Sequence, residues 1–177
     1  MSKSELKIIS EKTVDPTVAS VKPPFKIRQD GQRRYIRLEI SEPVSYSVLK
    51  DGNGRFSPSA ERPYYTGSIL NISAGGMLIV SENPLEEGTM IFLKMFLQEI
   101  EALDNIIGVV KRAEMDAGDW LIGVEFVSRE RLSDHLSDAE LRMLPENAAS
   151  FDERVKMALN KYIFYQKVTR ENKRQNA

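Results

Sequence analysis

The sequence of 177 residues contains no cysteine and only one histidine, His135. The lack of cysteine excludes disulfide bonds, thiolate nucleophiles and cysteine-rich metal sites. No apolar run approaches the roughly 18 residues that a membrane-spanning helix needs. The first ten residues also lack the apolar stretch of a secretory signal. We therefore expect a protein that has no membrane span and lies in the cytoplasm.

Neither sign of charge dominates the chain, because 25 Lys and Arg residues face 26 Asp and Glu residues and the net charge is -1. The charges are unevenly distributed, however. From position 22 to 37 there are six positive side chains and one negative one, a local charge of +5 (Lys22, Lys26, Arg28, Arg33, Arg34 and Arg37 against Asp30). A local excess of this size predicts an anionic partner for this segment rather than for the whole molecule.

The chain divides into three predicted parts. Residues 1–30 form an extended N-terminal arm, since three prolines interrupt any helix. Residues 31–130 carry short segments of alternating apolar and polar residues, which are typical of strands with one buried face. Six strands are expected, at 34–48, 64–72, 77–80, 90–97, 106–113 and 120–126, with serines 45 and 47 on the wet face of the first. Short strands at this spacing predict a mainly β fold, a six-stranded antiparallel barrel or sandwich.

Residues 131–177 are predicted to form a helical extension with two α-helices. Ser137 and Glu140 have the spacing of a capping box, and the same pattern recurs at Ser150 and Glu153. The second helix has an apolar stripe from 151 to 168, about five turns, followed by a basic end. We expect this stripe either to pack against the barrel or to join two copies of the chain.

Two groups of residues could carry the function. Arg33 and Arg37 stand four apart where the first strand begins, and Asn71 and Ser73 end the second strand just before Gly75 and Gly76. Guanidinium groups bind phosphate and pair with or stack on guanine. Asparagine and serine can hydrogen-bond a base edge. Adjacent glycines permit positive φ and a close approach of ligand to backbone.

The order Arg-x-x-x-Arg (33–37) and then Asn-x-Ser-x-x-Gly (71–76) resembles the two-part signature of PilZ domains. The strand 121–126 is also similar to the last barrel strand of that family. The resemblance implies a six-stranded antiparallel PilZ-like β-barrel that binds the bacterial second messenger cyclic di-GMP on its outer surface and needs no metal. The implied ligand-binding residues are Arg33, Arg37, Asn71, Ser73 and Gly76, with Gln32, Arg34 and Gly75 beside them. Many members have an arginine in place of Gln32, so one bound ligand or a stacked pair both stay open.

We expect the N-terminal arm to relay ligand binding to a downstream protein. The ligand's phosphates neutralise the basic arm, fold it over the barrel and change the surface offered to a downstream protein. Two alternatives stay open: an assembly module that acts through the helix at 151–168 without nucleotide, and a barrel that binds single-stranded nucleic acid. Catalysis is not expected, because Ser133, Asp134 and His135 are adjacent in sequence and do not form a triad. Asn71 and Ser73 could also serve only to hydrogen-bond their own backbone in a loop.

Overall fold

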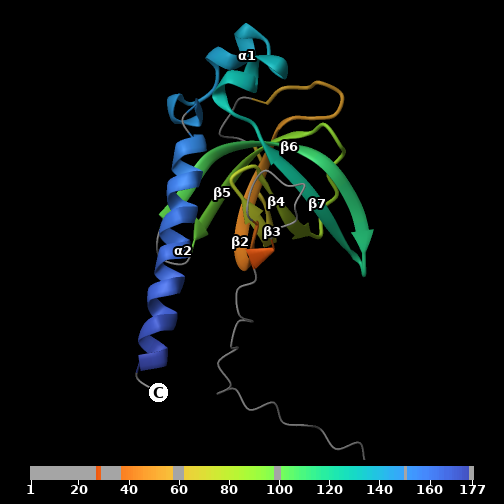
Figure 1. The fold of residues 1–177 in the computed structure, drawn as a ribbon. Coiled ribbons are helices and arrows are strands. Elements are labelled where there is room, and N and C mark those ends of the chain that lie inside the picture. The colour runs from red at the N-terminus through yellow and green to blue at the C-terminus, as the bar shows by residue number, and fades with distance from the viewer. Residues whose placement is uncertain (1–26, 29–36, 58–61, 98–100, 150, 176–177) are drawn as a thin grey trace, which may run out of the picture.

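A computed structural model describes residues 27–28, 37–57, 62–97, 101–149 and 151–175. The chain forms a closed antiparallel β-barrel with helices at its C-terminal end (Figure 1). The barrel strands are β2 (Arg37–Lys50), β3 (Tyr65–Ser73), β4 (Gly76–Ser81), β5 (Met90–Leu97), β6 (Glu101–Asp116) and β7 (Asp119–Phe126). They follow the order β2-β3-β4-β7-β6-β5, and pairing of β2 with β5 closes the barrel. The predicted six-stranded antiparallel barrel is therefore confirmed.

A two-residue strand, β1 (Ile27–Arg28), pairs with the start of β2. Its two residues stand opposite Leu38 and Arg37. The end of the predicted N-terminal arm thus adds a short edge to the barrel next to Arg37. The other predictions for the arm, residues 1–26 and 29–30, lie outside the described residues.

Apolar side chains from alternating strand positions fill the barrel. In β7 the alternation is regular, and Ile122, Val124 and Phe126 are all buried. Tyr46 is fully buried, and its hydroxyl shares a hydrogen bond of 2.7 Å with the Ser81 hydroxyl. This bond gives the phenol a partner and avoids the cost of burying an unpaired polar group.

A second, smaller core lies against the outside of β2, β5 and β6. It joins strand residues such as Leu49, Phe92 and Ile107 to Leu132 and Leu136 of the segment after the barrel. The prediction that Ser47 faces water is therefore wrong, since it is only 1% exposed. The sequence of β2 suggests one wet face, but later elements cover part of that face.

Four helical elements follow the barrel: η1 (Arg129–Asp134), α1 (Asp138–Arg142), η2 (Glu146–Ala149) and α2 (Phe151–Gln175). The capping box at Ser137 and Glu140 is present. The second predicted box includes Ser150, which lies outside the described residues. Both predicted α-helices are confirmed, and α2 ends in the predicted basic residues, although it is longer than five turns.

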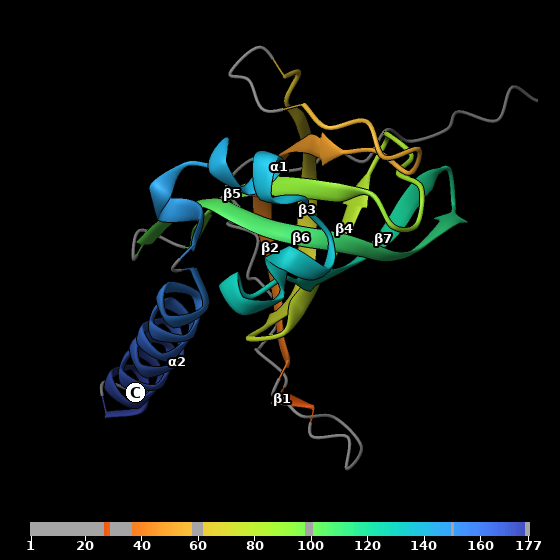
Figure 2. The ribbon, with the colours of Figure 1, turned by 90° about the horizontal axis from the view of Figure 1, so that it is seen from above.

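Helix α2 lies along one side of the barrel, and its C-terminal part extends past it (Figures 1 and 2). Val155, Ala158 and Leu159 are buried and belong to the main core. Arg154 donates to Asp104 on β6 over 3.1 Å. No helix in the described part of the chain is long and apolar enough to cross a membrane.

Candidate functional site

A groove of about 730 Å³ runs over the outer surface of β4, β6 and β7. Asn71, Ser73, Gly75 and Gly76 all line it. The structure therefore brings together the four predicted site residues for which it describes both backbone and side chain. The groove is open to solvent on one side and so suits a ligand that lies on the barrel rather than inside it.

A β-bulge in β3 positions Asn71 in this groove. Ile69 pairs with Ile79, whereas Asn71 pairs with Leu78, so one extra residue stands on the β3 side. Ile69 and Ile72 consequently both point into the core, three positions apart, and both are fully buried. A bulge of this kind re-aims side chains at the edge of a site. Asn71 between them is half-buried and lines the groove.

Ser73 stabilises the turn that joins β3 to β4. Its Oγ accepts a hydrogen bond from the Gly75 N–H (3.2 Å) and donates one to the Gly76 carbonyl (3.3 Å). The side chain is 7% exposed. Ser73 thus hydrogen-bonds the backbone of its own turn, as the alternative interpretation of the sequence expects. A hydroxyl oxygen has two lone pairs, so one of them is left to accept from a ligand.

Gly76 is needed for close packing rather than for an unusual backbone angle. A Cβ there would overlap the carbonyl oxygen of Val124 on β7. The expectation of positive φ at Gly75 or Gly76 is wrong, because the glycines with positive φ in the described chain are Gly54, Gly88 and Gly118. The motif glycine instead lets β4 pair with β7 at the floor of the groove.

A second bulge, in β6, turns two consecutive cations outward. The register shifts between Val110, which pairs with Val124, and Arg112, which pairs with Gly123. Lys111 and Arg112 are both exposed as a result, and both line the groove. The Arg112 side chain crosses Gly123, since a Cβ there would stand 2.9 Å from Cγ and 3.1 Å from Nε of the arginine.

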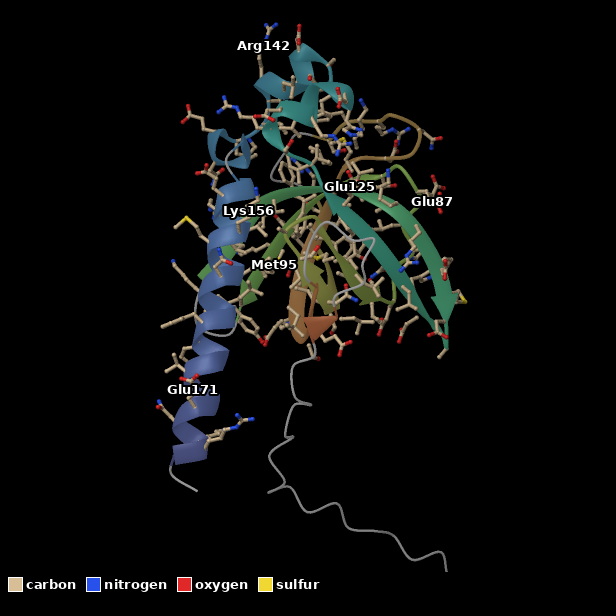
Figure 3. The ribbon with its side chains drawn as sticks, viewed as in Figure 1. Glu87, Met95, Glu125, Arg142, Lys156 and Glu171 are labelled. Carbon is tan, nitrogen blue, oxygen red and sulfur yellow. The ribbon has the colours of Figure 1, made fainter. Side chains whose placement is uncertain are left out.

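An ion-pair cluster lies at one end of the groove. Arg131 of η1 donates from Nη1 to Oε1 of Glu125 on β7 over 2.6 Å, and Lys111 lies 3.6 Å from the other carboxylate oxygen. The hydrogen bond from Arg131 holds the pKa of Glu125 below its usual range, and Lys111 adds to the effect. Glu125 is therefore an anion whose two neighbours are both groove cations. Figure 3 labels it on β7.

The arginine half of the predicted site is only partly described. Arg37 is the first residue of β2 and adjoins the pair Leu38–Ile72, so its backbone stands at the end of β3 that carries Ser73. Its side chain, and all of Gln32, Arg33 and Arg34, lie outside the described residues. The roles predicted for these four side chains stay predictions.

Sequence reasoning missed four cations that line the groove: Lys111, Arg112, Arg131 and Lys156. Two adjacent basic residues inside an apolar strand were the available signal for the first pair, because strict alternation would send one of them into the core. No motif marks Arg131 or Lys156. The described residues contain no cluster of three His, Cys, Asp or Glu side chains that could hold a metal ion.

Several known proteins are similar to this chain. Among solved structures, MrkH from K. pneumonia in complex with c-di-GMP matches with TM-score 0.48 and 19% identity, covering 79% of this chain and 54% of that one. YcgR from Escherichia coli, also in complex with c-di-GMP, matches with TM-score 0.45 and 15% identity over 82% and 51% of the two chains. The Bacillus subtilis inhibitor of motility MotI/DgrA matches with TM-score 0.42 and 18% identity over 76% and 54%.

This chain thus spans about half the length of those three structures. No curated protein matches the sequence significantly. The model of the PilZ domain family matches residues 31–138, which is more than half of the chain and includes all six barrel strands and both motifs. The protein belongs to the PilZ domain family.

Proposed function

We propose that this protein is a receptor for cyclic di-GMP that binds the messenger in the groove and signals to a partner protein. The observation that carries the proposal is that one groove holds both the Asn-x-Ser-x-x-Gly motif (71–76) and several cations. A cyclic dinucleotide presents two phosphates and two guanines, so it needs cations and base-edge partners at the same place. Membership of the PilZ domain family supports the same ligand.

The motif side of the groove would recognise guanine. The Asn71 amide offers a donor and an acceptor to a base edge, and the Ser73 hydroxyl keeps a free lone pair beside it. Gly75 has no Cβ, so a flat base can approach its backbone closely, while Gly76 shapes the groove beneath by packing against β7. These contacts would set the orientation of the base, while phosphate contacts supply much of the affinity.

Arg33 and Arg37 would bind phosphate or stack on guanine from the β2 side. β2 begins at Arg37, and Arg37 pairs with Arg28 of β1. Arginine is the residue type that binds phosphate through paired, charge-assisted hydrogen bonds. This supports a binding role for Arg37, with Arg33, Arg34 and Gln32 next to it in the chain.

The signal would pass through ordering of the N-terminal arm. The segment 22–37 carries a local charge of +5. Ligand phosphates would neutralise part of this charge and favour a folded arm, to the extent that the ligand prefers the ordered state. Hydrogen exchange tests the relay directly: residues 22–32 should gain protection with cyclic di-GMP. Equal protection with and without ligand would rule out the arm as the relay.

Calorimetric titration with cyclic di-GMP tests the receptor function. We expect saturable micromolar or tighter binding, about -8 kcal/mol, which is lost in Arg37→Ala. Arg55→Ala is the matched control, since Arg55 is exposed in the β2–β3 loop and does not line the groove. The stoichiometry would decide between one ligand and a stacked pair. An absence of heat and of thermal stabilisation at millimolar ligand would contradict the proposal.

Two further ligands in the same titration test the selectivity of the site and the alternative of nucleic-acid binding. GTP shows whether the site selects the cyclic dinucleotide, and a single-stranded oligonucleotide shows whether the barrel binds nucleic acid with the expected steep salt dependence. We assign no catalytic role to any residue of this chain. A receptor for an intracellular messenger would act in the cytoplasm.

A second candidate function, self-assembly, is favoured by the outer face of α2. Met157, Phe164, Tyr165 and Val168 are exposed there, and Phe164 is 69% exposed. Positions 157, 164 and 168 repeat with helical spacing and so share a face. Light scattering should show a dimer that Phe164→Glu dissociates, whereas Asn53→Glu, in the exposed β2–β3 loop, should leave the dimer intact. A monomer at all concentrations would exclude this candidate.

A further inference from the structure

The groove has two walls of different chemistry. The motif residues Asn71, Ser73 and Gly76 form one, and the cations Lys111, Arg112 and Arg131 form the other. The cations come from separate elements, β6 and η1, and the β6 bulge is what brings Lys111 and Arg112 to the same surface. Bulges that place two neighbouring side chains on one face commonly shape binding sites.

The cationic wall carries its own counter-ion. The carboxylate of Glu125 binds Arg131 at 2.6 Å and lies 3.6 Å from Lys111, while the Arg112 side chain lies over Gly123, two residues earlier in the same strand. Glu125 is itself partly exposed, with 36% of its side chain accessible. A second carboxylate, that of Glu130, also lines the groove. An incoming anion must therefore compete with Glu125 for the same guanidinium and ammonium groups.

We propose that Lys111, Arg112 and Arg131 bind a phosphate of the ligand and that Glu125 is the internal counter-ion which this phosphate displaces. The proposal rests on the proposed receptor function and adds a second phosphate subsite on the wall opposite the motif. Both Glu125 and a phosphodiester carry one negative charge, so the exchange costs little in net charge. A guanidinium can also bind phosphate through two parallel hydrogen bonds, which favours the exchange.

When the phosphate displaces Glu125, the Arg131 side chain on η1 would exchange one anionic partner for another. Arg131 is adjacent to Leu132, which is 3% exposed and anchors η1 in the outer core with Leu49, Phe92 and Val109. Arg131 also lies 3.9 Å from Asp134 of the same element. Transfer of Arg131 from Glu125 to a phosphate thus connects the groove to the segment that leads into α1 and α2. Because Glu125 competes with the phosphate for Arg131, it lowers the affinity of the groove for the ligand.

Four variants test the proposal by calorimetry with cyclic di-GMP. Glu125→Gln removes the competing charge and should tighten binding about tenfold, since a nearby like charge no longer repels the phosphate. Arg131→Ala should weaken binding about tenfold. Glu114→Gln and Arg129→Ala make the same charge changes on β6 and η1 but do not line the groove, and they should leave affinity unchanged.

The double variant separates a direct exchange from a general charge effect. If Glu125 acts through Arg131, adding Glu125→Gln to Arg131→Ala should give much less than the tenfold gain. Weaker or unchanged binding by Glu125→Gln, or unaltered binding by Arg131→Ala, would overturn the proposal. Thermal unfolding of each variant confirms that its fold is intact.

A second anion, pyrophosphate, distinguishes failure of the receptor function from failure of the phosphate subsite at Lys111, Arg112 and Arg131. Titration with pyrophosphate, followed by the NMR signal of the Arg131 Nε–H, should shift this signal in the wild type and more steeply in Glu125→Gln. If pyrophosphate shifts the signal but cyclic di-GMP does not bind, the receptor function fails and the anion site stands. If cyclic di-GMP binds but neither ligand shifts the signal, the receptor stands and this subsite fails.

Discussion

Gly76 on β4 stands directly opposite Glu125 on β7, and a Cβ on the glycine would overlap the carbonyl oxygen of the neighbouring Val124. The same close contact places the motif turn next to the carboxylate that binds the groove cations. On the other side of this turn, Phe126 N–H donates to the Gly75 carbonyl over 2.9 Å. The motif glycine therefore sets how closely β4, which carries the motif turn, approaches β7, which carries Glu125.

Gly76→Ala is expected to destabilise the protein as well as the site. The added methyl meets backbone and not a flexible side chain, so β4 and β7 must separate. Overpacking of this kind costs about 1–3 kcal/mol. Urea denaturation measures the loss in the free energy of unfolding. Ala74→Gly, in the same turn, serves as a comparison without added volume. A Gly76→Ala variant as stable as the wild type would show that the strands can separate freely.

Gly123→Val should weaken ligand binding with little effect on stability. A Cβ at this position meets the Arg112 side chain, which can swing away, and a β-branched residue suits a strand. The displaced guanidinium would leave the cationic wall, and we expect binding of cyclic di-GMP to fall about tenfold. Calorimetry on Gly123→Val, Arg112→Ala and the double variant checks the mechanism. Additive losses in the double variant would contradict it, because both changes should remove the same contact.

The barrel could be predicted from the sequence because most of its strands keep one buried face. Trp120, Ile122, Val124 and Phe126 alternate without a break, and the structure forms β7 over them. Asn71 and Ser73 stand two apart at the end of a predicted strand, which indicates that they share a face, and both line the groove. Residue types and a period of two are sufficient for these conclusions.

The cationic wall could not be predicted, because it depends on strand register and on tertiary packing. The bulge next to Lys111 follows from how β6 pairs with β7. The adjacent pair Lys111 and Arg112 breaks the alternation of its strand, but this local signal does not tell which surface the two side chains share. Arg131 lies in a 3-10 helix that is held by a single buried leucine, Leu132. Ser47 is buried for a related reason, since η1 and α1 cover a strand face that its own sequence leaves polar.

Glu140 should make the stability of the protein depend on pH. Its carboxylate accepts from the Ser137 backbone N–H (2.7 Å) and from Lys50 Nζ (3.1 Å). The first bond is the main cause that lowers the pKa of Glu140 below its usual value, and Lys50 contributes. A carboxylate with a lowered pKa stabilises the fold above its unfolded pKa, about 4.3. That contribution is lost as the pH falls through the folded pKa.

Thermal unfolding between pH 3 and 7 measures this effect with Glu140→Gln. The variant should melt below the wild type at pH 7, and the difference should shrink steadily as the pH falls below about 4.3. Glu146→Gln, an exposed neighbour in η2, is the matched control. A difference in melting temperature that stays constant down to pH 3 would show that the charge of Glu140 is not the cause.

Lys156 offers a direct route from the groove to α2. It lies on α2 and lines the same groove as the motif and the cationic wall, and Figure 3 labels it beside the barrel. A ligand phosphate within its reach would attract it and hold α2 against β6, where Arg154 already binds Asp104. We expect Lys156→Ala to weaken cyclic di-GMP binding about threefold, the modest effect of one exposed charge. Lys161→Ala, on the same helix outside the groove, is the matched control.

Hydrogen exchange shows which element receives the signal. If Lys156 couples the groove to α2, ligand should protect the amides of residues 151–162 in the wild type but not in Lys156→Ala. Protection confined to the N-terminal arm in both proteins would assign the relay to the arm alone. Protection of α2 that persists in Lys156→Ala would instead indicate transmission through Arg131 and η1. The two routes make different demands on a partner, because a partner that reads α2 would contact its exposed aromatic residues, Phe164 and Tyr165, instead of the arm.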